Sequence, residues 1–334
     1  MERYTMIEPP SCTAPEASDT PLPLLLPNVV LATDNRTAEV VTIKKLQIIA
    51  DKATCRVNDH VAMERRVYKH VTKMGGHANV LRLRESFQVQ GIEHLVLDHC
   101  PRGSLFDVLK ATTDKRFDAA TSLTYVGQIA DGLVFLHSLG YAHCDLSLEN
   151  VLVDDANMCK LCDFGFAADA TTKQVAAVGK YFYMAPEVHD TSSRGYDASQ
   201  ADVWSLGILL FIMLTGVAPF RQARVLDDRF ERFKQHGLAA LCDELHVSHL
   251  IPSDAFDALE AMLQVHPSTR VTIKDVVAAV GSTSCNQRQS DVASRTSSES
   301  DSTTSHRTLR RKVSLFRKVL DPFKRTKTLS QSTF

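Results

Sequence analysis

The spacing of apolar and polar positions separates the chain into a strand-rich part followed by a helix-rich part. Short apolar or alternating runs, which are typical of β-strands, occupy residues 28–32, 39–46, 81–90 and 93–99. Residues 59–73 show helical spacing, with Val61, Met63, Val67 and Val71 on or near one face. Residues 28–99 are therefore predicted to form a small, mostly β unit with one helix.

Helical spacing dominates after residue 104. An amphipathic helix is marked by Leu123, Val126, Ile129, Leu133 and Leu136, and Gly140 would end it, because glycine tolerates a positive φ angle. Residues 201–214 are apolar on nearly every face, which is typical of a helix at the centre of a folded unit. Further helices are predicted at 227–242, 253–265 and 272–280. The two patterns together predict an α+β fold.

The two ends of the chain differ in composition from the middle. Residues 1–21 are rich in Pro, Ser, Thr and acidic residues and are predicted to be a flexible leader. Residues 281–306 are rich in Ser and Thr and are predicted to be a disordered linker. In residues 307–334, apolar side chains recur every three or four positions among nine Lys and Arg, which predicts a basic amphipathic tail.

Charge and cysteine content exclude several classes of protein. The formal net charge of the chain is -1, so no nucleic-acid partner is expected, although the tail from Asp301 onward carries nine basic against two acidic residues. Eight scattered cysteines favour reduced thiols, and the Cys159–Cys162 pair lacks a second pair that would complete a zinc site. No secretory signal is recognisable, and the apolar run 21–32 is too short to span a membrane. We therefore expect a soluble protein of the cytoplasm or nucleus.

Five short motifs occur in a fixed order along the chain. They are VTIK at 41–44, HCDLSLEN at 143–150, DFG at 163–165, APE at 185–187 and DVWSLG at 202–207. One such motif is weak evidence, but five in this order and spacing are not expected by chance. On these motifs the chain resembles the eukaryotic protein-kinase family, nearest its calmodulin-dependent and energy-sensing Ser/Thr branches.

The resemblance implies an architecture as well as an activity. It covers residues 22–280 and implies a bilobal protein-kinase fold, with a small β-rich N-lobe containing one helix at about 22–99 and a larger helical C-lobe at about 100–280. The expected activity is transfer of the γ-phosphoryl group of MgATP to Ser or Thr hydroxyls. Protein substrates are expected because the segment between DFG and APE resembles one that positions peptides.

The resemblance also assigns roles to individual residues. Asp145 would accept the proton of the substrate hydroxyl, and Lys44, paired with Glu64, would bind the α- and β-phosphates of ATP. Asn150 and Asp163 would supply oxygen ligands to Mg²⁺. Other candidates shape the adenine pocket or brace the loops: Val29, Leu97, Asp98 and Cys100 for adenine, and Asp202, Glu187 and Arg270 for structure.

The expected phosphate-binding lid departs from the family pattern. Residues 22–27 read LPLLLP where the family has a glycine-rich loop, and the first glycine of the chain is Gly75. Glycines let backbone N–H groups approach phosphate oxygens, whereas proline removes the N–H. Three interpretations compete: a lid that binds ATP weakly, a pseudokinase that has lost nucleotide binding, or a wrongly predicted N-terminal exon. Weakened binding is favoured, because Lys44, Glu64, Asn150 and Asp163 are all present.

Two further positions suggest an exchange of side chains. The catalytic loop has Ser147 where the family has Lys, and the segment before APE has Lys180 where the family commonly has Thr. Loss of a charge-assisted hydrogen bond worth about 1.5–3 kcal/mol would slow transfer by about ten- to hundredfold. We hypothesise that Lys180 reaches the γ-phosphate and that Ser147 takes the role of the hydroxyl. The competing interpretation is that Lys180 is an ordinary surface lysine.

A third departure concerns regulation. Cys144 replaces the Arg that in the family receives an activation-segment phosphate, and the usual phosphorylation position holds Ala176. The loss of both partners predicts activity that is independent of activation-segment phosphorylation. Thr171 and Thr172 remain as less well placed acceptors.

The main competing function is a pseudokinase scaffold, which the glycine-free lid favours. A small-molecule kinase is disfavoured by the APE segment and the long helical part. Residues 307–327 are expected to bind a calmodulin-like protein, a docking partner or an anionic membrane surface, although a solvated tail without a partner fits the composition equally well.

Overall fold

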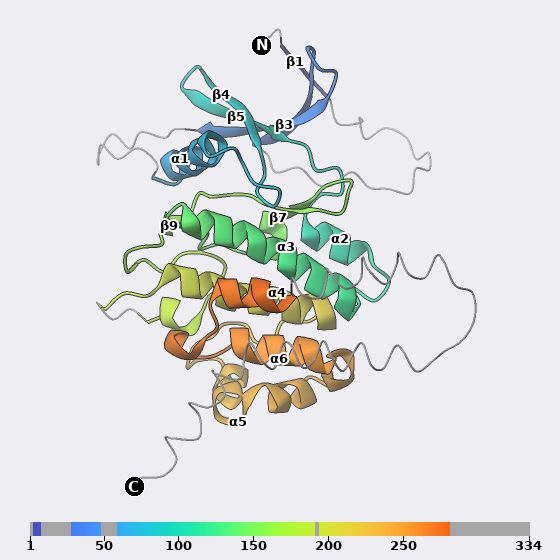
Figure 1. The fold of residues 1–334 in the computed structure, drawn as a ribbon, viewed down its shortest axis with the longest axis vertical. Coiled ribbons are helices and arrows are strands. Elements are labelled where there is room, and N and C mark those ends of the chain that lie inside the picture. Colours follow the sequence, from blue (N-terminus) through green and yellow to red (C-terminus); the bar gives the residue numbers. More distant parts are fainter. Residues whose placement is uncertain (1–2, 8–27, 48–58, 191–193, 281–334) are drawn as a thin grey trace, which may run out of the picture. The chain divides into compact units, whose positions relative to one another are not determined.

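Figure 1 shows the computed structural model, which describes residues 3–7, 28–47, 59–190 and 194–280. The chain divides into two units. The first contains Met1–Val108 and Glu149–Ala167, and the second contains Leu109–Leu148 and Ala168–Phe334. The predicted lid at 22–27, the linker at 281–306 and the tail at 307–334 lie outside the described residues.

A five-stranded antiparallel sheet forms the first unit, in the order β1-β2-β3-β5-β4. Its strands are β1 (Tyr4–Met6), β2 (Val29–Asp34), β3 (Val40–Gln47), β4 (Leu83–Val89) and β5 (Ile92–Asp98). Helix α1 (Asp59–Lys73) buries Glu64, Val67, Tyr68 and Val71. The predicted mostly β unit with one helix is therefore confirmed.

Strand β1 corrects the prediction of a flexible leader, which is wrong for residues 3–7. The strand pairs with β2, and Tyr4 is 7% exposed within a core cluster that includes Ala32, Ile43 and Val96. Arg3 forms ion pairs with Asp34 and with Glu85 at 2.6 Å each. A strand of three residues is too short for its alternation to show in the sequence, and its partners lie far along the chain.

A short hairpin from the middle of the chain also belongs to the first unit. It consists of β7 (Val151–Val153) and β8 (Cys159–Leu161), and the 3-10 helix η1 (Leu148–Asn150) precedes it. The Leu161 N–H donates to the Asn79 carbonyl, and the Leu161 carbonyl accepts from the Leu81 N–H, both at 2.9 Å. These bonds attach the hairpin to the segment that leads into β4.

The second unit is mainly helical. It contains α3 (Ala119–Ser138), α4 (Ala198–Thr215), α5 (Asp228–Glu244), α6 (Ser253–Met262) and a helix at 273–280, while α2 (Leu105–Ala111) crosses the boundary between the units. Two short strands pair within it, β6 (Tyr141–Ala142) and β9 (Ala168–Asp169). Its 3-10 turns are η2 (Pro186–Val188), η3 (Ser248–Leu250) and η4 (Pro267–Thr269). The predicted α+β fold is thus confirmed.

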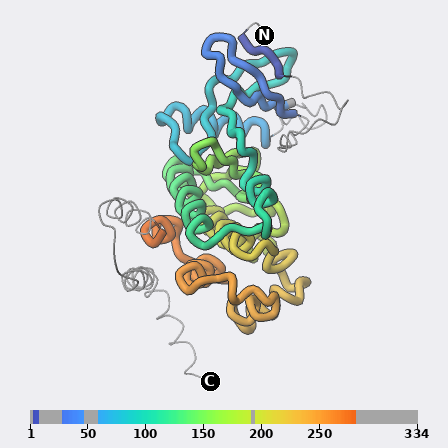
Figure 2. The backbone as a smooth tube through the Cα atoms, turned by 90° about the vertical axis from the view of Figure 1, so that its right-hand side faces the viewer, coloured from blue at the N-terminus to red at the C-terminus, as the bar shows by residue number. Residues whose placement is uncertain are grey.

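Helix α4 is the centre of the second unit. It contacts both α3 and α6, and the tube in Figure 2 follows these helices through the unit. The side chain of Asp197 caps its N-terminus by accepting from the Ser199 and Gln200 N–H groups. Among the described helices α4 alone is long and apolar enough to cross a membrane, but 83% of that stretch is buried inside the unit. Burial on every side explains its uniformly apolar sequence.

Candidate active site

In the first unit an ion triad joins β3, α1 and the residue that follows the β7–β8 hairpin. The Lys44 ammonium lies 2.7 Å from a Glu64 carboxylate oxygen and 3.1 Å from Oδ1 of Asp163. Burial alone would lower the pKa of Lys44, but the attraction of the two carboxylates outweighs it and raises this pKa above its usual value. Lys44 is therefore a permanent cation next to a partly exposed carboxylate.

The hairpin brings Asn150 and Asp163 close together. The Cys162 N–H donates to the Asn150 carbonyl at 3.1 Å, so the residues before β7 and after β8 are neighbours. Asp163 has a positive φ of 64°, and its side chain is 39% exposed, whereas Asn150 is buried. A carboxylate and an amide oxygen are hard ligands, and Mg²⁺ is commonly bound by one or two carboxylates together with substrate phosphates. This donor set therefore fits Mg²⁺.

The residues expected to contact adenine also lie in the first unit. Val29 is directly opposite Lys44 in the β2–β3 ladder, and Leu97 is buried on β5. The Asp98 N–H donates to the Arg82 carbonyl, and the Cys100 carbonyl accepts from the Gly103 N–H. Burial raises the pKa of the Cys100 thiol to about 12, so the thiol stays protonated.

Asp202 of α4 anchors the catalytic loop in the second unit. Its carboxylate accepts from the N–H groups of His143 and Cys144 at 2.8 and 2.9 Å. A third contact, 2.8 Å long, joins it to Nε2 of His137 on α3. Cys144 has a positive φ of 63°, so the anchored loop makes a sharp turn just before Asp145.

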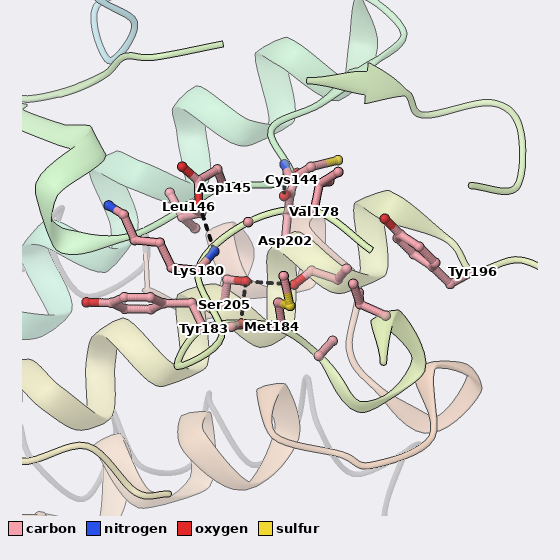
Figure 3. A pocket seen from close by; sticks show the side chains of 14 residues that line it. Cys144, Asp145, Leu146, Val178, Lys180, Tyr183, Met184, Tyr196, Asp202 and Ser205 are labelled. Atoms are coloured by element: carbon pink, nitrogen blue, oxygen red, sulfur yellow. Dashed lines mark hydrogen bonds between the residues drawn. The ribbon is translucent and has the colours of Figure 1, made fainter. Parts of the chain in front are cut away.

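Asp145 and Lys180 lie side by side near this anchor, as Figure 3 shows, and Lys180 also contacts Ser147. Oδ1 of Asp145 accepts the Lys180 N–H at 3.0 Å, and the Lys180 ammonium donates to the Ser147 hydroxyl at 2.7 Å. Gly179 makes this approach possible, because its φ is 101° and a Cβ atom there would lie 2.6 Å from the Cys144 carbonyl. The structure thus places the two residues of the hypothesised exchange in direct contact.

A buried ion pair between Arg270 and Glu187 also lies in the second unit. Arg270 binds both carboxylate oxygens of Glu187, at 2.6 and 3.0 Å, and also donates to the carbonyls of Gln200 and Gln264. Its guanidinium lies 5.2 Å from the centre of the Trp204 ring. The pair therefore ties the APE segment to α4 and to the end of the described chain.

The predicted site residues fall into two groups. The first unit brings together Lys44, Glu64, Asn150, Asp163, Val29, Leu97, Asp98 and Cys100, and the second brings together Asp145, Ser147, Lys180, Asp202, Glu187 and Arg270. The sequence did not indicate His137, Gly179 or Tyr196, which support the catalytic loop and the segment facing it. Gly179 could have been suspected, because it is a lone glycine beside a catalytic motif.

Comparisons with known proteins bear on the family of the chain. A family model described as "Protein kinase domain" matches residues 26–280. The chain is 31% identical over 201 residues to an Aurora kinase of Yarrowia lipolytica, across 60% of this chain and 51% of that protein. It is 32% identical over 207 residues to the maternal embryonic leucine zipper kinase of Danio rerio, across 60% of this chain and 29% of that protein.

A plant protein gives a similar result. The chain is 32% identical over 225 residues to CBL-interacting serine/threonine-protein kinase 15 of Arabidopsis thaliana, across 65% of this chain and 50% of that protein. The chain thus spans about half or less of the length of these curated relatives.

Proposed function

Because the chain belongs to the protein kinase family, we propose that it transfers the γ-phosphoryl group of MgATP to Ser and Thr hydroxyls of proteins. The observation that carries the proposal is the fixed position of Asp145. The Lys180 N–H donates to its carboxylate. The loop that carries Asp145 is anchored by Asp202 of α4, which accepts from the His143 and Cys144 N–H groups. A carboxylate held in this way can accept the proton of a substrate hydroxyl.

The first unit would hold the nucleotide. Lys44 would bind the α- and β-phosphates, and Glu64 would keep the ammonium in place. The Asp98 carbonyl and the Cys100 N–H would bond the adenine edge, as the resemblance to the family implies. Asn150 and Asp163 would hold Mg²⁺, which when bound neutralises the charge of the triphosphate.

The second unit would carry out the transfer. As the substrate oxygen bonds to the γ-phosphorus, the bond from phosphorus to the β,γ-bridging oxygen breaks and the hydroxyl proton passes to Asp145. Positioning and electrostatic stabilisation supply most of the rate enhancement in such reactions. Lys180 would stabilise the moving phosphoryl group. Its backbone N–H is bonded to Asp145 and its ammonium to Ser147, so the positive charge lies beside the catalytic carboxylate.

The exchange of side chains between positions 147 and 180 can be tested directly. Lys180→Thr should lower kcat by about ten- to hundredfold, because a charge-assisted hydrogen bond to the phosphoryl group is lost. Adding Ser147→Lys to that variant should restore most of the rate, since the lysine then occupies the family's usual position. Steady-state transfer to a Ser peptide measures both effects.

Lys173→Thr is the matched control, because Lys173 is an exposed lysine of the same segment. It should leave kcat unchanged. Full activity of Lys180→Thr, or no recovery in the double variant, would show that Lys180 is an ordinary surface lysine.

We also propose that activity does not require phosphorylation of the activation segment. Cys144 provides a thiol that contacts the Ala142 carbonyl at 3.8 Å, and a neutral thiol cannot bind a phosphate as an arginine does. Burial raises the pKa of this thiol well above its usual value, so it remains neutral. Ala176 has no hydroxyl to modify.

The alternative function is a scaffold that binds nucleotide weakly or not at all. The sequence at 22–27 favours it, since two prolines and no glycine stand where a phosphate-binding loop is expected. A regulatory partner is a further proposal. The name of the Arabidopsis relative records interaction with a CBL protein, and the basic segment 307–327 of this chain could bind a calmodulin-like protein, a docking partner or an anionic membrane.

One assay separates kinase from scaffold. The full chain, treated with phosphatase and then freed of it, is given γ-labelled MgATP with a basic Ser peptide or its Tyr counterpart. We expect label on the Ser peptide, little on the Tyr peptide, and the same rate as for untreated protein. Absence of label, together with a melting temperature that MgATP does not raise, would support the scaffold.

A further inference from the structure

The segment between DFG and APE, residues 166–184, is the activation segment. A set of hydrogen bonds joins it to Tyr196. Gln174 and Tyr196 exchange two backbone hydrogen bonds, of 2.9 and 2.8 Å, as an isolated antiparallel bridge. The Tyr196 hydroxyl donates to the Ala176 carbonyl at 2.8 Å. Three bonds therefore hold residues 174–176 against a single tyrosine, and one of them ends at the position where the family usually carries its phosphate.

Tyr196 is well placed to connect this segment to the catalytic loop. It directly precedes Asp197, which caps α4, and α4 carries Asp202, which in turn holds the His143 and Cys144 N–H groups. Tyr196, Cys144 and Val178 line one small cavity, and Figure 3 shows the hydroxyl end of Tyr196 pointing toward Val178. The activation segment and the catalytic loop thus share one support within the second unit.

The Tyr196 hydroxyl is suited to a permanent contact. The residue is 5% exposed, and burial, together with the charge of the Asp202 carboxylate, raises the pKa of Tyr196 above its usual value. The hydroxyl therefore remains a donor across the physiological pH range. A phosphate contact, by contrast, exists only after modification.

Gly195 permits the close approach of the two segments. Its φ is 65°, and a Cβ atom there would lie 2.9 Å from the Gln174 carbonyl oxygen and 3.0 Å from the Lys173 side chain. Any other residue would push residues 173–174 away and would also strain the backbone. Gly195 therefore allows the close approach, and Tyr196 supplies the hydrogen bonds of the bridge.

From these contacts we propose that Tyr196 is the positioning residue that holds the activation segment ready for peptide binding, in place of the missing arginine–phosphate pair. The inference rests on the proposed kinase function and adds the element that makes phosphorylation unnecessary. In this proposal Tyr196 acts through other residues and not by contact with the reacting atoms. Its effect passes through residues 174–176 on one side and through α4 on the other.

The test removes the hydroxyl alone. Tyr196→Phe in the full chain should lower kcat/KM for a Ser peptide by about two- to tenfold, the equivalent of one neutral hydrogen bond, and leave KM for ATP unchanged. Amide exchange measured by mass spectrometry should accelerate most in peptides covering residues 172–178. Gly195→Ala should have a larger effect of the same kind.

Tyr125→Phe is the matched control, because Tyr125 is a buried tyrosine of α3 whose ring packs on Phe117. It should change neither kcat/KM nor exchange at 172–178. If Tyr196→Phe gives the control's results in both measurements while the wild type is active, the proposal is overturned and the kinase function stands. If the wild type is inactive, the kinase function fails. Faster amide exchange at residues 172–178 in Tyr196→Phe would then still support the role of Tyr196 in holding this segment. Unchanged exchange would overturn that role as well.

Discussion

Replacing Asp145 with Asn should lower kcat for peptide phosphorylation by a factor of about 10²–10⁴, the usual contribution of a positioned general base. The substitution removes the basic oxygen but keeps an oxygen that can accept the Lys180 N–H, so the loop should keep its shape. The melting temperature and the affinity for MgATP should therefore stay close to those of the wild type. Single-turnover transfer to a Ser peptide measures the loss in the chemical step.

Asp155→Asn provides the comparison for this variant. Asp155 is an exposed carboxylate in the turn between β7 and β8, so the same change of atoms there should leave kcat unaltered. Equal rates for Asp145→Asn and the wild type would mean that the observed transfer comes from a contaminating kinase or from a different base. That result would remove the assignment of Asp145.

Replacing Arg270 with Met should lower the free energy of unfolding by about 3–5 kcal/mol, the cost of breaking a buried ion pair on one side. Arg270 is completely buried, and its loss would leave the Glu187 carboxylate without its cation. The carbonyls of Gln200 and Gln264 would lose a donor as well. Denaturant unfolding followed by Trp204 fluorescence reports the change, because Trp204 lies against the guanidinium.

Two comparisons show whether burial is the cause. Adding Glu187→Gln to Arg270→Met should recover part of the loss, because no uncompensated charge then remains inside the unit. Arg232→Met removes an exposed arginine paired with Glu244 and should cost only a small fraction of the buried case. Similar losses for Arg232→Met and Arg270→Met would contradict this account.

The elements that the sequence predicted best are those whose pattern is local. Helix α1 begins and ends at the predicted residues 59 and 73, because its apolar positions repeat at helical spacing throughout. Helix α3 begins at Ala119, earlier than its first marked apolar residue, because Asp118 caps it through the Thr121 N–H. That cap is visible in the sequence and could have been used.

What the sequence did not predict depends on contacts between distant positions. The burial of Tyr4 requires strands β2 to β5, and the support given by Tyr196 requires a segment twenty residues earlier in the chain. Neither contact leaves a periodic signal. The motifs identified which residues to consider at the site, whereas the contact of Lys180 with Ser147 could only be hypothesised. The catalytic part of that hypothesis stays a prediction.

Strand β1 has a consequence for the order of events during synthesis. Tyr4 leaves the ribosome before its partners, because its strand partners lie around residues 32–34 and its hydroxyl bonds to Glu85, 81 positions later. Contacts so distant along the chain form late, because the intervening residues must be made and brought together first. We therefore expect the nascent sheet to be incomplete, with its apolar centre open at one edge, until β4 and β5 have emerged. A chaperone that binds extended apolar segments would find its target there.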